Sequence, residues 1–137
     1  MYKTYYASPI GQILILTDEN ALLGLWLENQ KYFGAGYDLE QAQQEETKVS
    51  QHVAAWLDAY FKGENPATDE IPLAPQVTEF RSKVLTVLQK IPYGQTATYL
   101  DILRELQAEY GKIGSARAVG GAIGHNPISI IIPCHRL

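Results

Sequence analysis

The first part of the chain consists of short apolar and aromatic runs separated by polar, turn-forming residues. The runs cover residues 2–7, 12–17 and 22–27, and the breaks between them are Ser8-Pro9-Ile10-Gly11 and Asp18-Glu19-Asn20. Short runs rich in β-branched and aromatic residues, bounded by Pro, Gly, Asn and Asp, are typical of antiparallel strands. We therefore predict an antiparallel meander at the start of the chain.

The spacing of apolar residues changes in the second quarter of the chain. Residues 28–47 have no clear period and are predicted to form a loop. A stripe at helical spacing begins near Lys48 and ends at Gly63, which favours one helix after the strands. The residues of this stripe are Val49, Val53, Trp56, Leu57 and Tyr60.

Proline residues then divide the chain in two. Residues 66–77 contain three prolines and are predicted to form a linker. This gives an N-terminal domain of residues 1–65 and a C-terminal domain of residues 78–137.

The second domain is predicted to be mainly helical. Thr78, Thr98 and Ser115 each precede a helical pattern and can cap it, and Asp101 is at the third position after its cap. The apolar stripes are Phe80, Val84, Val87 and Leu88 in the first helix and Tyr99, Ile102, Leu103 and Leu106 in the second. A turn is expected at Pro92-Tyr93-Gly94, between the first two helices. The last two helices, joined by a short glycine-containing turn, form a helix-turn-helix pattern.

The third of these helices, expected to end near Ile123, has an unusual composition. Gly120 and Gly121 lie in its interior, where a glycine costs about 1 kcal/mol relative to alanine. Tight packing against another helix would account for such small residues. Arg117, however, is the only long charged side chain on this surface. A single cation on a helix that permits close approach suits contact with phosphates or insertion into a duplex.

The last apolar run, residues 128–133, is predicted to be a short strand that leads to Cys134 and His135. A cysteine among apolar neighbours is usually inert, and nucleophilic use requires a base or positive charge that maintains the thiolate. Because successive side chains of a strand face opposite ways, direct contact between the two residues would need a backbone turn, or else a bridging water. Both an inert and a reactive thiol remain open from these residues alone.

The charge of the chain is unevenly distributed. The net charge is −4, but the residues before Gln76 hold 4 basic and 11 acidic side chains, a net −7, whereas the rest hold 7 basic and 4 acidic, a net +3. This asymmetry permits a polyanion to dock on the second part alone, although a +3 segment is also compatible with a plain solvated surface.

Composition also bears on the compartment. A single cysteine cannot form an internal disulfide, and no apolar run is long enough to span a bilayer. Residues 1–4 lead into polar and aromatic residues, without the apolar core of a secretory signal peptide. We therefore expect a cytoplasmic protein without membrane contact.

Four segments together resemble the O6-alkylguanine-DNA alkyltransferase family. They are residues 91–99, residues 115–122, Asn126-Pro127 and the run Ile132-Pro133-Cys134-His135-Arg136, which matches the family's active-site signature. The segments follow the family's order and spacing. The resemblance is dense over residues 78–137 and looser before them.

For the fold, the resemblance implies an α/β N-terminal lobe, with a ribonuclease-H-like antiparallel sheet plus helix, and a mainly α, winged-helix-like helix-turn-helix lobe. The first lobe would act as a scaffold. Some relatives hold zinc there partly through cysteines, but here Cys134 is the only cysteine and His52 is isolated, so we expect no metal and no cofactor.

For function, the resemblance implies single-turnover DNA repair, in which an alkyl group moves irreversibly from O6-alkylguanine, or O4-alkylthymine, in double-stranded DNA onto Cys134. The damaged nucleotide is flipped out of the duplex. Arg117 would fill the gap, and Tyr99 would press on the adjacent phosphate and hold the flipped base. The small residues expected to approach the minor groove are Ala116, Ala118, Gly120 and Gly121. No obligate protein partner is expected, and the protein would be a monomer.

The resemblance also assigns roles around the thiol. His135 would act through a water to keep Cys134 deprotonated, and Asn126 would brace the turn that positions the active-site segment. The residues expected to shape the substrate pocket, through side chains or backbone carbonyls, are Ser129, Pro133, Cys134 and Leu137.

Family members continue beyond the position of Leu137 with a loop over the alkyl pocket and a final helix, which includes a glutamate that orients the histidine. Without this tail His135 would lack its partner, so we expect a 137-residue form to be weakly active or inactive. The main alternative is a non-enzymatic, lesion-binding protein of the alkyltransferase-like type, in which tryptophan usually replaces the cysteine. Two further alternatives are a cysteine hydrolase and a transcription factor with an incidental thiol.

Overall fold

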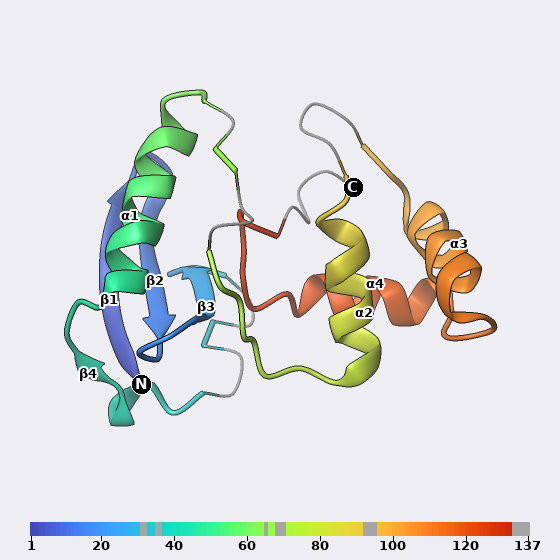
Figure 1. Cartoon of the computed structure of the whole chain (residues 1–137), viewed down its shortest axis with the longest axis horizontal. Helices are drawn as coiled ribbons and strands as arrows, with labels where there is room; N and C mark the ends of the chain where they lie inside the picture. The colour runs from blue at the N-terminus through green and yellow to red at the C-terminus, as the bar shows by residue number, and fades with distance from the viewer. Residues whose placement is uncertain (31–32, 35–36, 65, 68–70, 92–95, 133–137) are drawn as a thin grey trace. The chain divides into compact units, whose positions relative to one another are not determined.

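The computed structural model describes residues 1–30, 33–34, 37–64, 66–67, 71–91 and 96–132 (Figure 1). The chain forms two compact units, Met1–Gln76 and Val77–Leu137. No helix in the described parts of the chain is long and apolar enough to cross a membrane.

A four-stranded sheet forms the centre of the first unit. Its strands β1 (Tyr2–Ser8), β2 (Gly11–Thr17) and β3 (Leu22–Leu27) pair antiparallel, which confirms the predicted meander. A short 3-10 helix, η1 (Leu39–Gln41), precedes β4 (Gln43–Gln44), which pairs parallel with β1, so the strand order is β3-β2-β1-β4. The sequence predicted only a loop here, because a two-residue strand has no periodicity to detect.

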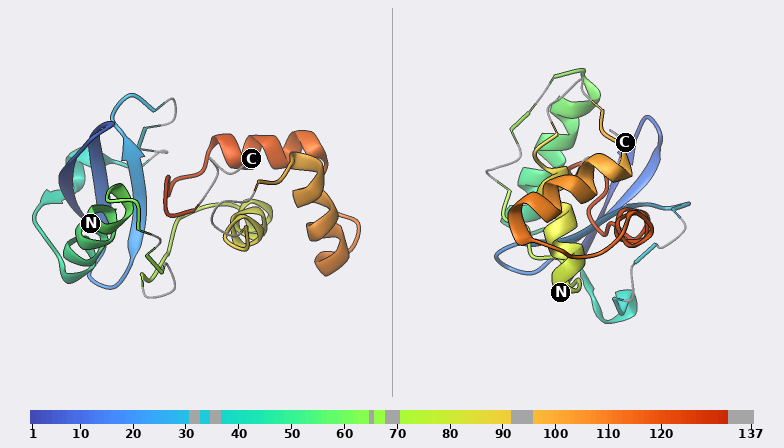
Figure 2. Two further views of the ribbon diagram at one scale, coloured as in Figure 1. Left: turned by 90° about the horizontal axis from the view of Figure 1, so that it is seen from above. Right: turned by 90° about the vertical axis from the view of Figure 1, so that its right-hand side faces the viewer.

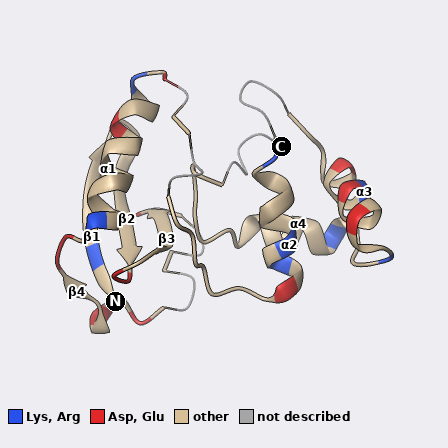
Figure 3. Cartoon of the chain, in the orientation of Figure 1, with Lys and Arg blue, Asp and Glu red and all other residues tan. Residues whose placement is uncertain are grey.

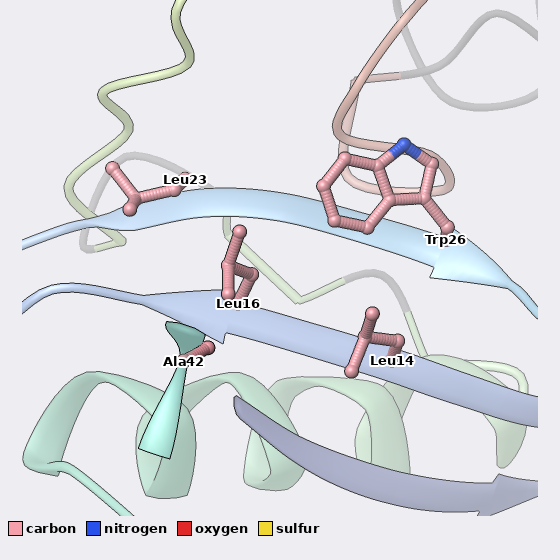
Figure 4. Packing of buried hydrophobic residues seen from close by; sticks show 5 residues of the cluster. All are labelled: Leu14, Leu16, Leu23, Trp26 and Ala42. Carbon is pink, nitrogen blue, oxygen red and sulfur yellow. The ribbon is translucent and has the colours of Figure 1, made fainter. Parts of the chain in front are cut away.

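Strand β2 is buried on both faces of the sheet. Its central residues, Ile13 to Leu16, are at most 2% exposed, as expected for a continuous apolar run. Helix α1 (Lys48–Phe61) packs against β1 and β2. A hydrophobic cluster of five residues draws on β2, β3 and the residue before β4 (Figure 4). The five residues are Leu14, Leu16, Leu23, Trp26 and Ala42.

Helix α1 begins where the sequence predicts, and side-chain contacts attach it to β1. Thr47 caps it by accepting from the N–H of Ser50, and the Ser50 hydroxyl accepts from the N–H of Thr47 in return. Near its other end, the Tyr6 hydroxyl of β1 donates to Asp58, and the Tyr6 ring stacks on Phe61 at 6.4 Å between centroids. These contacts hold the helix along the outer part of the sheet.

Part of the proline-rich segment pairs with the sheet of the first unit. The N–H of Leu22 donates to the Pro72 carbonyl at 2.8 Å, and the N–H of Ala74 donates to the Leu22 carbonyl at 2.9 Å. Proline lacks an N–H donor but retains its carbonyl, so Pro72 can take part in this bridge only as an acceptor. Residues 71–74 are therefore anchored to β3.

The second unit contains α2 (Glu79–Leu88), α3 (Tyr99–Tyr110) and α4 (Ala116–Gly124), which contact one another pairwise (Figure 2). All three predicted caps are confirmed: Thr78, Thr98 and Ser115 each accept from the backbone N–H three residues later. The most deeply buried side chains of this unit are Val84, Leu88, Leu106, Val119, Ile128 and Ile132.

Candidate nucleic-acid interface and active-site turn

Helix α4 presents its small residues to solvent. Val119, Ala122 and Ile123 form its buried face, whereas residues 115–118 are exposed. A Cβ built at Gly121 would meet nothing within 4 Å. Packing against another helix therefore does not explain this glycine, and the exposed small-residue surface leaves room for an external surface to approach the backbone.

Gly120 differs from Gly121 because it has an aromatic neighbour. A Cβ built at Gly120 would lie 3.2 Å from Cε2 and 3.5 Å from Cδ2 of Tyr99, the first residue of α3. The Tyr99 ring therefore lies against the backbone of α4 at this glycine. The ring is nevertheless 47% exposed, so one side of it remains open to solvent.

This exposure corrects one sequence prediction. The helical spacing placed Tyr99 in one apolar stripe with Ile102, Leu103 and Leu106, but only the last three are buried. Tyr99 is in the first turn of α3, where its ring reaches α4 instead of the core, and its hydroxyl is most stable in water.

Arg117 is on the same face of α4 as Gly120, because residues three apart on a helix are neighbours. Helix α4 contains no acidic residue (Figure 3), and Arg117 forms no ion pair with any residue in the described part of the chain. Lys83 and Lys90, by contrast, pair with Glu79 at 3.4 Å and with Glu109 at 3.3 Å. The guanidinium of Arg117 is thus available to an external anion or duplex.

The start of α3 is fixed by a capping box. The Asp101 carboxylate accepts from the N–H of Thr98 at 2.9 Å, and the Thr98 hydroxyl accepts from the N–H of Asp101 at 3.1 Å. The pKa of the Asp101 carboxyl is held below its usual value. The main cause is the hydrogen bond from the Thr98 backbone, and the second is the hydrogen bond with the Thr98 side chain. The cap therefore defines the helix position from which Tyr99 projects.

A tightly braced turn follows α4. Asn126 is 2% exposed, accepts from the N–H of Ile128 at 3.0 Å and donates from Nδ2 to the Ile132 carbonyl at 3.1 Å. The buried Asn126 side chain thus holds both ends of the segment 128–132. This segment leads directly to Pro133.

The same segment corrects the predicted strand. Residues 129–131 form a turn, in which the N–H of Ile131 donates to the Ser129 carbonyl at 2.7 Å and Ile130 has φ of 70°. Positive φ is strained for a β-branched residue, and a γ-turn of this hand is rare. The apolar run looked like a strand, but Asn126 takes up backbone groups that a strand would pair elsewhere.

His125 ends α4. Its backbone N–H donates to the Gly121 carbonyl at 3.2 Å, and its ring Nδ1 lies 2.8 Å from the same oxygen. No group of three His, Cys, Asp or Glu residues within the described ranges could hold a metal ion.

Several predicted site residues lie outside the described residues. These are Pro133, Cys134, His135 and Leu137, together with the expected turn at Pro92-Tyr93-Gly94. The structure does bring Tyr99 against Gly120, and Arg117 lies one turn before Gly120 on the same helix. The sequence did not reveal that the Tyr99 ring lies on Gly120, because no spacing rule relates residues of two different helices.

Comparisons with known proteins cover both units. Residues 1–75 match the ribonuclease-like domain of 6-O-methylguanine DNA methyltransferase, and residues 79–137 match its DNA binding domain. A methylated-DNA–protein-cysteine methyltransferase of Haemophilus influenzae is 39% identical over 137 residues, which are all of this chain and 73% of that protein. A constitutive relative of the same name from Bacillus subtilis is 32% identical over 136 residues, 99% of this chain and 79% of the relative.

A solved structure shows the same fold. The crystal structure of Mycobacterium tuberculosis OGT in complex with DNA has a TM-score of 0.82 and 33% sequence identity, and the match covers 99% of this chain and 77% of that one. With both domains matched in order, and relatives that match over the whole of this chain at more than 30% identity, the chain belongs to the 6-O-methylguanine DNA methyltransferase family.

Proposed function

We propose that this protein repairs DNA directly, by moving an alkyl group from O6-alkylguanine, and also from O4-alkylthymine, onto its own Cys134. The observation that carries the proposal is the match of both family domains across the chain. The relatives that match over the whole chain are methylated-DNA–protein-cysteine methyltransferases. The reaction is a single turnover, because the thioether formed is stable.

The proposed DNA-binding surface is the exposed side of α4 together with Tyr99. Four small residues would let the backbone of α4 approach the minor groove, namely Ala116, Ala118, Gly120 and Gly121. Arg117 would enter the duplex and occupy the place of the flipped nucleotide, while Tyr99 would press on the adjacent phosphate. The exposure of Ala116, Arg117, Ala118 and Tyr99 and the absence of an acidic side chain on α4 support this assignment.

The proposed chemistry is an in-line displacement at the alkyl carbon. A bond forms between the Cys134 sulfur and this carbon while the bond from the carbon to O6 breaks, and guanine leaves with the electron pair. The thiol proton passes through a water to His135 and is available to neutralise the departing guanine. Asn126 would hold the preceding turn, Ser129 and Pro133 would line the pocket, and the carbonyls of Cys134 and Leu137 would accept from the guanine amino group.

We further propose that residues 1–65 act as a scaffold, residues 66–77 as a linker and residues 78–137 as the DNA-binding and active-site domain. The protein would act in the cytoplasm as a monomer on duplex DNA, without an obligate protein partner.

Peptide mass spectrometry tests the proposal. The protein is incubated with an oligonucleotide duplex that contains O6-methylguanine, with Cys134→Ala as the control. We expect one methylene mass to be gained on the Cys134 peptide of the parent and none in the variant. Lesion-selective binding without mass gain would favour a non-enzymatic lesion-binding protein, and turnover of an activated ester without mass gain would favour a hydrolase.

A further inference from the structure

The pairing of Tyr99 with Gly120 points to a role for this glycine that close approach to DNA does not require. Two neighbouring glycines of α4 are both half-buried, yet only one lies beneath an aromatic ring. A Cβ at Gly120 would be 3.2 Å from the Tyr99 ring, whereas a Cβ at Gly121 would have no neighbour within 4 Å. A heavy-atom contact of 3.2 Å is tighter than most, so the ring would have to shift by a few tenths of an ångström to admit this atom.

The Tyr99 ring has few other restraints on its outer side. It is 47% exposed, and the residue is at the first position of α3, where the capping box fixes the backbone but not the ring. The contact with α4 therefore decides where this side chain rests. Because the ring can move outward into solvent, a side chain at position 120 would displace it without a large loss of stability.

We propose that Gly120 is a positioning residue for Tyr99. Because Gly120 has no side chain, the Tyr99 ring can pack against the backbone of α4, on the same surface as Arg117, where the protein meets DNA. The inference rests on the proposed function, since it assigns Tyr99 a part in holding the substrate. It adds a second demand on α4, because Gly120 serves a contact with α3 within the chain as well as the approach of DNA, whereas Gly121 serves only the approach of DNA.

The position of the ring can be read without DNA. In the parent protein, NMR should show a nuclear Overhauser contact between the Gly120 Hα protons and the Tyr99 ring protons. In Gly120→Ala, the Tyr99 ring resonances should shift. In Gly124→Ala, a glycine of the same helix with nothing within 4 Å of its Cβ position, they should keep their places. Unchanged Tyr99 resonances in Gly120→Ala would overturn the proposal, whatever the protein does with DNA.

The functional consequence is measured by a double-mutant cycle on the rate of methyl transfer from a duplex containing O6-methylguanine. Gly120→Ala should slow transfer by about three- to tenfold in the parent and in Tyr99→Phe, which keeps the ring. In Tyr99→Ala the loss should be clearly smaller, because no ring is left to displace and only the direct approach of the added methyl group to DNA remains. Gly121→Ala, which touches no ring, should give the same fold-change in all three backgrounds.

Two outcomes of the cycle would contradict the proposal. An equal loss from Gly120→Ala in the parent and in Tyr99→Ala would mean that the added methyl group obstructs DNA directly. No loss in any background would mean that the ring position does not matter for transfer. Failure of the proposed function itself is distinguishable, because the parent protein would then show no methyl transfer before any variant is compared.

Discussion

At the scale of single residues, Asn126 joins α4 to the segment that ends at the thiol. It is buried and makes one hydrogen bond as an acceptor and one as a donor, to two residues four positions apart. Between them lies Ile130, whose positive φ costs about 1–3 kcal/mol and persists only if its surroundings enforce it. The two hydrogen bonds of Asn126 flank Ile130, and we infer that they provide this restraint.

Replacing Asn126 should therefore destabilise the protein. We expect Asn126→Ala to lower the free energy of unfolding by about 2–3 kcal/mol, because it leaves a buried N–H and a buried carbonyl without partners. Urea unfolding measures this loss. In an Ile130→Gly background, where no strained residue has to be held, the loss should be smaller. An equal loss in both backgrounds would show that Asn126 does not restrain Ile130.

A second residue-scale prediction concerns Gly24 in the first unit. A Cβ at this position would lie 2.0 Å from Cη2 of Trp26, and Trp26 is completely buried, so its ring has no space into which to move. Gly24→Ala should cost about 1–3 kcal/mol of stability from overpacking. Thermal unfolding followed by tryptophan fluorescence checks this. Gly124→Ala, with open space around its Cβ position, is the matched control and should not lower the melting temperature.

These residues mark the limit of what the sequence predicts. The role of Asn126 as a brace came from the family resemblance and not from the residue pattern alone. The positive φ of Ile130 was not predicted. Nor was the packing of aromatic rings against the backbone at Gly24 and Gly120. They depend on which side chain lies over which backbone atom, and neither periodicity nor residue type fixes that.

At the scale of elements, caps were predicted well and short pairings poorly. Thr78, Thr98 and Ser115 act through backbone groups three residues away, so a local sequence contains the whole interaction. The two-residue strand β4 pairs with β1 across about 40 positions of sequence, and no local pattern signals such a contact. The final apolar run was wrongly predicted as a strand because hydrophobicity alone does not distinguish a buried strand from a buried turn.

The capping box of α3 gives a pH-dependent prediction. Because hydrogen bonds to Thr98 lower the pKa of Asp101 in the folded state, the unfolded state binds this proton more readily. The stabilisation is present at neutral pH, above the unfolded pKa near 3.8, and is lost as the pH falls through the lower folded value. Asp101→Asn should therefore reduce the melting temperature at neutral pH.

The difference between parent and Asp101→Asn should narrow as the pH is lowered below that of an ordinary aspartate, about 3.9. Thermal unfolding by circular dichroism, across a series from about pH 7 to about pH 2.5, measures it. Glu105→Gln, on the same helix but outside the capping box, is the control and should show no such narrowing from this contact. A constant difference at every pH would contradict the role of the Asp101 charge.

At the scale of the whole molecule, the uneven charge predicts which unit contributes to DNA binding. The residues from Gln76 onward hold seven basic side chains, and two of these, Lys83 and Lys90, are already paired with glutamates. Five others remain, and because Arg117 is proposed to enter the base stack, four are counted for phosphates, which limits the slope of log affinity against log salt to about −3.6. The residues before Gln76, with a net −7, should add nothing favourable.

Fluorescence anisotropy with a duplex oligonucleotide, titrated at several salt concentrations, tests this partition. Lys62→Ala, in the first unit, should leave affinity and slope unchanged. Arg117→Ala should weaken binding by about tenfold, equivalent to about 1.4 kcal/mol. Its slope should change by less than about 1, because a side chain inserted in the base stack neutralises no phosphate, whereas loss of a phosphate contact removes a full unit. A slope steeper than the four remaining cations allow, or a loss of affinity in Lys62→Ala, would mean that the first unit also binds the duplex.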